Sequence, residues 1–500
     1  MKKRQCGMLM HISSLPSKYG IGDFGPAAYR FVDFLHSAKQ KLWQILPLSP
    51  TDPVYYNSPY LNLSTFALNP LFISPDLLVN DGFIKETDVY SAQSFSLSHK
   101  EVDYPKVTAF KSILCSNLSL DIINVKNSNE YQDFCTLNKD WLDNYALFTV
   151  LKKYYKGTLW KTWPPEIRDR SADAVQFWEN TLKEEIESIK CVQFLLEKQW
   201  FSLKKYCNDN GINIIGDLPI YVDYNSSDVW SNQEIFKLDE SKSPYAVAGV
   251  PPDYFSETGQ LWGNPVYNWD ELKKSNYSWW IKRLKRAFTL YDTVRIDHFR
   301  GLVAYWEVPA HETTAINGKW VSVPVEDFLN TVNKELRNVS FIAEDLGIIT
   351  PDVVEIMDIY SLQGMKVLQF AFGGELGTNS YLPHNHVENC FLYTGTHDNN
   401  TVRGWYEHNA TEEEKSNIVK YIGKKITNEN ITWEIIRMAM LSVANTTIIP
   451  MQDFLNLGNE ARMNTPSVAE NNWQWRLSSL DFDVTLIKKY IDLLSLSGRT

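Results

Sequence analysis

The amino-acid sequence predicts an α/β protein, a (β/α)8 TIM barrel with a mainly helical insertion between strands 2 and 3 and a long loop after strand 3. Three observations support this prediction. Eight short apolar runs recur along the 500 residues, amphipathic helical patterns lie between them, and 44% of the residues are hydrophobic. Buried strands that alternate with helices are typical of a parallel sheet, and eight such units form a barrel of about 250 residues. The other residues must therefore lie in long connections.

Each predicted strand is a short run rich in Val, Ile, Leu or Phe, as buried parallel strands are. The runs lie at 8–12, 42–46, 212–215, 293–296, 341–343, 367–370, 391–393 and 447–449. Between them, segments 26–40 and 280–291 place apolar residues at i, i+3, i+4 and i+7, which predicts amphipathic helices. The basic run KRLKR in the second helix is expected to form its solvated face.

The two longest connections are expected to form separate parts of the fold. Segments 141–155 and 177–206 have helical patterns and lie between strands 2 and 3. We therefore expect a barrel from residues 1–70 and 206–500, and an inserted helical subdomain over 71–205. After strand 3, the segment YAVAGVPPDYFSETGQLWGNP is rich in Pro, Gly and aromatic residues. It predicts a structured aromatic loop over 240–270.

Composition excludes several classes of function. The formal net charge is −11 and the pI is near 5.4, whereas a phosphate backbone needs a basic surface, so we expect no nucleic-acid partner. No apolar run approaches the ~18 residues of a membrane span, and the first residues do not form a signal peptide, so we expect no membrane partner and a cytoplasmic protein. The six Cys have no CxxC pair, and calcium-loop and dinucleotide motifs are absent. We therefore expect no metal and no cofactor.

Acidic residues follow several predicted strands. Asp217 follows strand 3, Asp297 strand 4, Glu344 strand 5 and Asp398 strand 7. The carboxyl ends of barrel strands form the active site in this fold, so these side chains are expected to converge. Each carboxylate alone could instead cap the following helix. As a set they would repel each other and lose hydration, which a purely structural barrel would avoid, so they predict a catalytic site.

The spacing of these residues suggests a mechanism. Arg295 and Asp297 are two apart on a strand and project from the same face, so the guanidinium should lower the pKa of Asp297 and keep it ionised as a nucleophile. Glu344 follows an apolar run, and burial should raise its pKa toward that of a general acid. Two carboxyl groups with opposed pKa shifts are what glycosidic bond cleavage requires. Asp398 could then hold sugar hydroxyls.

The chain also resembles a known family. The strings HISSLPSKYGIGDFG, LWQILPLSPT, NSPY, AGVPPDYFSETGQLWGNP, VRIDHFRG, AEDLG, LPHN, GTHDN and EARMNTPS are similar to those of glycoside hydrolase family 77, the 4-α-glucanotransferases of the α-amylase clan. They follow in the family's order from about His11 to Arg476, and only the insertion is weakly covered. One departure is the segment 57–62, where the family often has Asp-Ser-Pro-Tyr-Gln-Ser and this chain has Asn57, Leu61 and Asn62 in place of the Asp, Gln and Ser. It bears on hydrogen bonds just beyond Tyr60.

This resemblance implies a retaining transfer of α-1,4-glucan segments from a donor glucan to the 4-hydroxyl of an acceptor glucan or glucose, through a covalent glucosyl-Asp intermediate. It assigns Asp297 as the nucleophile, Glu344 as the acid/base and Asp398 as the third carboxylate. The other residues that it places at the substrate are Tyr60, Asp217, Tyr254, Phe255, Trp262, Arg295, His298, His397 and Asn464. The resemblance also implies that the aromatic loop over 240–270 lies over the active site, on the acceptor side. We expect Tyr254 and Phe255 to stack on the acceptor and to shield the intermediate from water.

Two other functions remain open at this point. An α-amylase-type hydrolase would use the same carboxylates, and a non-catalytic glucan-binding protein would keep only the groove. The sequence also leaves open a monomer or a homodimer, the preferred chain lengths, and whether the pathway involves maltose, glycogen or starch.

Overall fold

The computed structural model describes residues 4–92, 100–118, 125–252, 256–337, 339, 341–347 and 349–500. Eight parallel strands form one sheet, in the order β10-β11-β12-β1-β2-β3-β6-β9. They are β1 (Gln5–Leu9), β2 (Leu42–Gln44), β3 (Asn213–Leu218), β6 (Thr293–Ile296), β9 (Phe341–Ala343), β10 (Gly364–Val367), β11 (Cys390–Tyr393) and β12 (Thr446–Pro450). A parallel bridge between Ile342 and Gln363 joins the two end strands, so the sheet closes and the predicted barrel is confirmed.

Every predicted apolar run overlaps a strand, but two of them are displaced along the chain. The run at 8–12 overlaps β1, which ends at Leu9 and is followed by a 3-10 helix over Ile12–Ser14. The run at 367–370 meets only the last residue of β10, and Leu368–Phe370 form another 3-10 helix. In both places the apolar run continues past the strand because these residues are buried. The apolar runs therefore predicted correctly which residues are buried, but they predicted the ends of these two strands less accurately.

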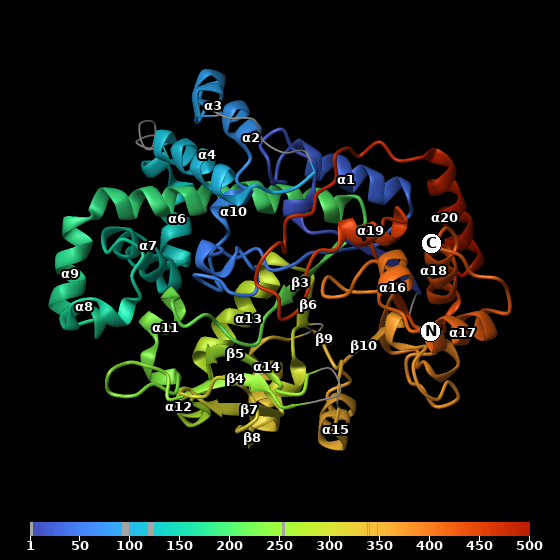
Figure 1. Ribbon diagram of the computed structural model, residues 1–500. Helices are drawn as coiled ribbons and strands as arrows, with labels where there is room; N and C mark the ends of the chain where they lie inside the picture. The colour runs from blue at the N-terminus through green and yellow to red at the C-terminus, as the bar shows by residue number, and fades with distance from the viewer. Residues whose placement is uncertain are drawn as a thin grey trace.

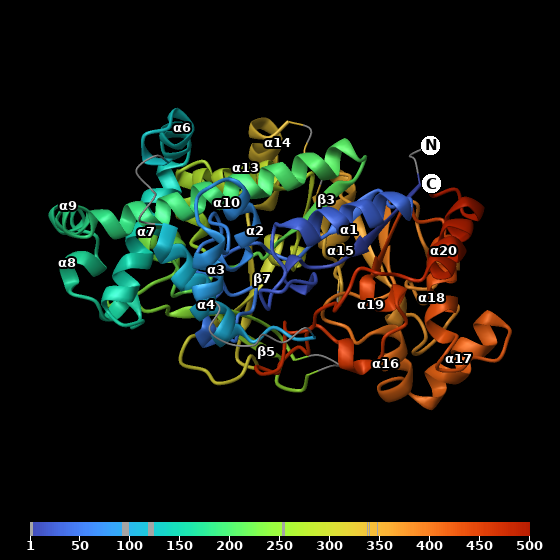
Figure 2. The same ribbon diagram turned by 90° about the horizontal axis from the view of Figure 1, so that it is seen from above.

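Helices surround the barrel and form both ends of the molecule (Figures 1 and 2). Between β2 and β3 lie α2 (Pro75–Asn80), α3 (Glu86–Ala92), α4 (Tyr104–Asn117), α6 (Asn129–Leu137), α7 (Lys139–Tyr154), α8 (Pro165–Arg168), α9 (Ala172–Thr181) and α10 (Lys183–Asp209). The other helices are α1 (Pro26–Ser37), α11 (Ser227–Ser231), α12 (Trp269–Lys274), α13 (Ser278–Leu290), α14 (Val325–Glu335), α15 (Pro351–Ile359), α16 (Val402–His408), α17 (Glu412–Ile422), α18 (Ile431–Leu441), α19 (Met451–Phe454) and α20 (Val484–Leu496). The helical insertion is therefore present between the second and third barrel strands. Its last helix, α10, also contacts β3 and α1, so it belongs to the barrel wall as well.

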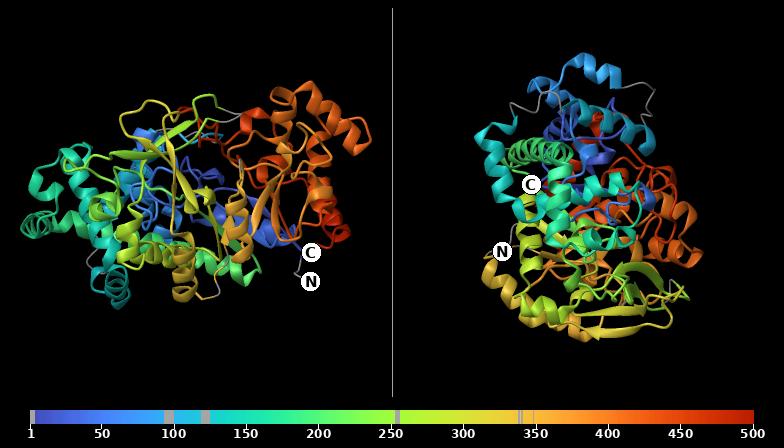
Figure 3. Two further views of the ribbon diagram at one scale, coloured as in Figure 1. Left: turned by 90° about the horizontal axis from the view of Figure 1, so that it is seen from below. Right: turned by 90° about the vertical axis from the view of Figure 1, so that its left-hand side faces the viewer.

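The segment 240–270 is more ordered than the loop that we predicted. It contains β4 (Ala246–Val250) and β5 (Gln260–Pro265), which pair with each other in an antiparallel register. β4 also pairs with β7 (Ala304–Pro309), and β7 pairs with β8 (Lys319–Ser322), so the two connections that flank β6 share one sheet in the order β5-β4-β7-β8. This sheet lies to one side of the barrel in Figure 1 and at the lower edge of the right-hand view in Figure 3.

The basic run in α13 is only partly solvated, which corrects the sequence-based expectation. Lys282 and Lys285 are exposed, but Arg283 and Arg286 are only 1% and 7% exposed. Arg283 donates to the carbonyl oxygens of Pro219 and Ile220. Arg283 therefore fastens the helix to the chain that follows β3, because the carbonyls there need donors. Arg286 instead donates to the backbone oxygen of Phe66, in the chain after β2, and pairs with Glu197 on α10.

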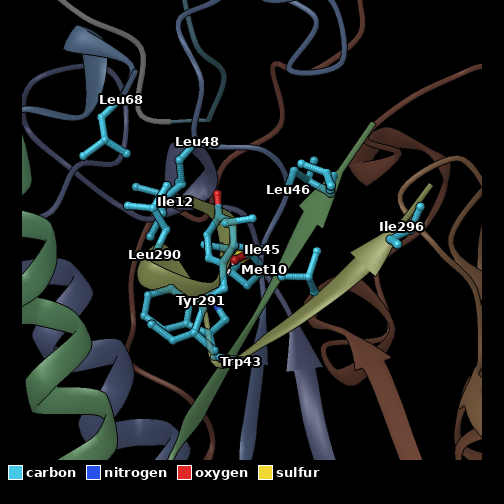
Figure 4. Close-up of a cluster of buried hydrophobic side chains, with 14 of the residues drawn as sticks. Met10, Ile12, Trp43, Ile45, Leu46, Leu48, Leu68, Leu290, Tyr291 and Ile296 are labelled. Carbon is cyan, nitrogen blue, oxygen red and sulfur yellow. Dashed lines mark hydrogen bonds between the residues drawn. The ribbon is translucent and has the colours of Figure 1, made fainter. Parts of the chain in front are cut away.

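Two layers of apolar side chains support the barrel. Inside the barrel, a buried cluster takes residues from most of its strands, namely Leu9, Leu42, Ile215, Ile342, Met365, Val367, Phe391, Tyr393 and Ile448. Outside it, a larger cluster fills the space between strands and helices, and Figure 4 shows Trp43, Leu290 and Tyr291 in this layer. Both layers hold the strands rigidly, so the residues at their carboxyl ends are well positioned.

Within these described ranges, no helix is both long and apolar enough to cross a membrane. All six Cys residues are free thiols.

Near the C-terminus, the buried Arg499 donates to five backbone carbonyl oxygens, including that of Gln5 at 3.1 Å. This side chain therefore joins the C-terminal segment to β1.

Candidate active site

A cavity of about 740 Å³ opens at the carboxyl ends of the barrel strands. Its wall includes the predicted site residues Tyr60, Trp262, Asp297, His298, His397, Asp398 and Asn464. Asp217, Arg295 and Glu344 contact these wall residues through the bonds described below. A cavity of this size is typical of small-molecule sites, and the predicted residues meet at one place.

Arg295 lies between two of the predicted acids. Its Nη1 donates to both carboxylate oxygens of Asp217, at 2.8 and 2.7 Å, and its Nη2 lies 2.9 Å from Asp297 Oδ1. Asp217 and Arg295 are register partners on β3 and β6, which explains the short contact. The Tyr60 hydroxyl donates to Asp217 Oδ2 at 2.7 Å. The guanidinium therefore fixes Asp297, and Asp217 fixes the guanidinium.

Glu344 lies on the strand beside Asp297. Ile296 and Ala343 are register partners, and the next residues along the two strands are Asp297 and Glu344. Neighbouring strands lie about 4.8 Å apart, so the two carboxyl groups rise from adjacent positions. Glu344 Oε2 accepts from the backbone N of His298 at 2.7 Å, and Oε1 accepts from that of Leu346 at 2.9 Å. Two amide donors thus orient this carboxyl group.

Asp398 is held from the opposite side of the cavity. Asn464 Nδ2 donates to Asp398 Oδ1 at 2.7 Å, and His397 Nε2 lies 3.4 Å from Asp398 Oδ2. The ring of His397 stacks on Tyr60, with centroids 5.0 Å apart and an interplanar angle of 16°. Tyr60 therefore links the two halves of the site, because its hydroxyl binds Asp217 and its ring supports His397.

The two neighbouring carboxyl groups have raised pKa values. Burial raises the pKa of Asp297 to about 6, with help from the charges of Asp217 and Asp398, although Arg295 lowers it. Burial and the charge of Asp297 raise the pKa of Glu344 to about 7. The expected rise at Glu344 is thus present, but the expected low pKa at Asp297 is wrong, because its desolvation outweighs the guanidinium. Asp297 still ionises before Glu344 does.

Aromatic groups line the other side of the cavity. Trp262 on β5 contacts His298 edge to face, at a centroid distance of 4.8 Å. Burial lowers the pKa of His298 to about 4, so its ring is neutral near pH 7. Tyr254 and Phe255, which the sequence places in the same segment as Trp262, lie outside the described residues. Their predicted contact with the acceptor stays a prediction.

Two residues of the site were not predicted. Trp473 lines the cavity, with its ring 5.8 Å from Tyr60 and 6.0 Å from His397. Arg462 Nη2 donates to the backbone oxygen of Asp398 at 3.1 Å, and its Nε donates to that of Asn464 at 2.7 Å. Nothing in the sequence distinguishes Trp473 from the other Trp residues of the chain. Arg462 falls inside the string EARMNTPS, which was its only signal.

One further acid at a strand end, Asp453, has a structural role. The buried Asp453 accepts from Thr394 Oγ1 at 2.6 Å and from the backbone N of Val402 at 2.7 Å, at the start of α16. The alternative role of a strand-end acid was to cap the helix that follows it. Asp453 instead lies within α19, the helix after β12, and accepts from the first residue of α16. In the part of the chain that the structure describes, no group of three or more His, Cys, Asp or Glu is placed to hold a metal ion.

Comparison with known proteins gives a consistent result. The family model of glycoside hydrolase family 77, described as 4-alpha-glucanotransferase, matches residues 10–482. A 4-alpha-glucanotransferase of Clostridium butyricum is 45% identical over 491 residues, which cover 98% of this chain and 100% of that protein. One of Synechocystis is 45% identical over 482 residues, which cover 95% of this chain and 94% of that protein.

The fold agrees with a solved structure of the same kind. The amylomaltase of Streptococcus agalactiae in complex with acarbose superposes with a TM-score of 0.95 at 38% identity, covering 99% of this chain and 100% of that chain. The match thus includes the barrel, the insertion and the antiparallel sheet. The chain belongs to glycoside hydrolase family 77 and is a 4-alpha-glucanotransferase.

Proposed function

We propose that the chain transfers segments of α-1,4-glucan by a retaining double displacement through a glucosyl ester on Asp297. The donors and acceptors would be malto-oligosaccharides, with glucose as the smallest acceptor. The observation that carries the proposal is the pairing of Asp297 and Glu344 at adjacent register positions, with Arg295 on the first and backbone amides on the second. A retaining mechanism needs two such carboxyl groups about 5–5.5 Å apart.

In the first step, a carboxylate oxygen of Asp297 attacks the anomeric carbon while the bond to the leaving 4-oxygen breaks. Glu344 donates its proton to that oxygen. In the second step, an acceptor 4-hydroxyl attacks the same carbon, its proton passes to Glu344, and the ester bond to Asp297 breaks. The order of the two pKa values supports these roles, because Asp297 can be ionised while Glu344 still carries its proton.

Asp398 and its neighbours would hold the sugar ring that reacts. Asp398 accepts from Asn464 and lies beside His397, so its carboxylate is oriented and charged near the developing positive charge. Tyr60 would contribute its ring face, since aromatic rings pack on the C–H faces of sugars. Removal of the Asp398 carboxylate or the Tyr60 ring would therefore weaken binding of the transition state more than it would lower the stability of the fold.

Transfer must also compete with water. Water is present at ~55 M, so the site must favour a sugar hydroxyl by binding the acceptor. We infer that Tyr254 and Phe255 stack on the acceptor, together with Trp262, and shield the ester. Replacement of both by Ala should raise the ratio of hydrolysis to transfer. An unchanged ratio would contradict this role.

Incubation with maltotriose tests the proposed function. A transferase makes glucose together with chains longer than three units, whereas a hydrolase makes only shorter sugars. A fluorinated glucosyl donor should leave a glucosyl adduct on Asp297, which mass spectrometry of a digest locates. If longer chains form but no adduct is found at Asp297, the transferase activity is supported and the glucosyl ester on Asp297 is refuted.

The predicted cytoplasmic location remains a prediction, which cell fractionation tests. The choice between a monomer and a homodimer is equally open, and light scattering during size-exclusion chromatography decides it.

A further inference from the structure

A second cavity lies on the outer side of the barrel, between the insertion and the barrel helices. Its volume is about 410 Å³, and it shares no wall residue with the cavity at the strand ends. Helix α7 of the insertion, α11 and α13 contribute to its wall, together with Phe66 from the chain after β2. The volume falls within the range of about 300–1,000 Å³ that small-molecule sites have.

The charged groups of this wall are already neutralised by protein partners. Lys282 Nζ lies 2.6 Å from Asp140 Oδ2, and Arg286 Nη2 lies 2.7 Å from Glu197 Oε2. The other two charged wall residues, Lys285 and Asp228, face Glu335 and Arg283 respectively. An ion entering the cavity would find no unbalanced charge to replace its hydration. The ligand chemistry that fits is therefore neutral.

The uncharged part of the wall combines aromatic rings with amides and hydroxyls. Phe66 and Trp141 are nearly parallel, at 13° and 6.4 Å between centroids, and Trp279 meets Phe66 edge to face at 6.1 Å. Asn232 donates its amide hydrogens to the backbone oxygen of Asp228 and to Ser231 Oγ, at 2.8 and 2.9 Å, so what it can offer a ligand is its carbonyl oxygen. Apolar rings beside fixed polar groups suit a ligand with C–H faces and a hydroxyl rim.

We propose that this cavity is a non-catalytic site for a glucose unit of an α-1,4-glucan, held by Trp141 and Asn232. The choice of sugar rests on the transferase activity, because malto-oligosaccharides are the neutral polyhydroxy compounds that this enzyme meets. A second attachment point on the outer wall would keep a long glucan near the enzyme between successive transfers.

Calorimetric titration with maltotriose tests the proposal in the Asp297→Asn background, in which the sugar is not consumed. Trp141→Ala removes part of the wall, and Ser278→Trp fills the mouth of the cavity from an exposed position, so it keeps the core contacts. Each variant should bind one maltotriose fewer than the Asp297→Asn parent. Trp178→Ala, at a partly buried Trp of the same insertion outside the cavity wall, should bind as many as the parent.

Two results would overturn the proposal. One is an unchanged number of bound sugars in both Trp141→Ala and Ser278→Trp, with melting temperatures that show both are folded. The other is a loss of one site in Trp178→Ala as well. In the enzyme that retains Asp297, Trp141→Ala should leave kcat/KM for maltotriose within about twofold of the value without this substitution. If the enzyme that retains Asp297 and Trp141 does not disproportionate maltotriose at all, the proposed function fails instead, whatever the cavity binds.

Discussion

Replacement of Asn464 by Ala tests whether the third carboxylate must be oriented for catalysis. The change removes the 2.7 Å hydrogen bond from Asn464 Nδ2 to Asp398 Oδ1. A hydrogen bond to a charged group is worth about 1.5–3 kcal/mol. The side chain of Asp398 is 45% exposed, so water can replace part of the bond, and the lower end applies. Since about 1.4 kcal/mol is a factor of ten in rate, we expect kcat/KM to fall about tenfold.

The assay is release of glucose from maltotriose, with kcat and KM measured separately. The Asn464→Asp variant should lose more activity than Asn464→Ala, because it places a second negative charge beside Asp398. Asn208 offers a matched control, since its Nδ2 donates to Asp292 Oδ2 at 3.0 Å outside the cavity wall. Asn208→Ala should leave kcat/KM unchanged. If Asn464→Ala also stays within twofold of the parent, the orientation of Asp398 by Asn464 does not matter for the reaction.

Four further results are expected. Glu344→Gln should fold normally and lose at least about 100-fold in rate, because an amide cannot serve as acid or base; a wild-type rate at an unchanged melting temperature would remove that role. A plot of kcat/KM against pH should be bell-shaped, falling below about pH 6 as Asp297 gains a proton and above about pH 7 as Glu344 loses one, whereas a flat profile would contradict both roles. Asp217→Asn should lower the free energy of unfolding by about 3 kcal/mol, measured by urea titration, because Arg295 loses a buried charge partner. It should also move the acid limb of the pH profile to lower pH, because a negative charge that raises the pKa of Asp297 is gone. An unmoved acid limb would refute the influence of Asp217 on the pKa of Asp297. Arg499→Met should cost about 3 kcal/mol by leaving buried carbonyl oxygens without donors, and a melting temperature equal to the parent's would show that this contact is dispensable.

The barrel was predictable because its strands are short, buried and separated by amphipathic helices, so each produces its own local pattern. The antiparallel sheet was not, because β4 must pair with β7 across the whole of α12, α13 and β6. No local pattern reports such a distant pairing, and the Pro- and Gly-rich hairpin suggested a loop. The same reason explains α13, where the arginines look like surface residues until their distant carbonyl partners are known.

The candidate site shows a similar division. Asp297 and Glu344 could be placed from the sequence because each directly follows a buried strand, and adjacent barrel strands bring their ends together. The pKa of Asp297 could not be predicted from the sequence. It depends on how far the loss of hydration on burial, which raises it, outweighs the charge of Arg295, which lowers it, and only the packed structure determines that balance. Trp473 was missed because it contacts Tyr60 from a part of the chain without a predicted strand.

The antiparallel sheet that spans the connections on both sides of β6 limits how this enzyme can be altered. Its outer strands come from separate connections, and each hairpin completes the hydrogen bonds of the other. A deletion in either connection would therefore leave the partner hairpin with an unpaired edge. Trp262, which we propose to contact the acceptor, lies on one of these strands, so an attempt to graft a different acceptor specificity through this residue would have to exchange both connections together.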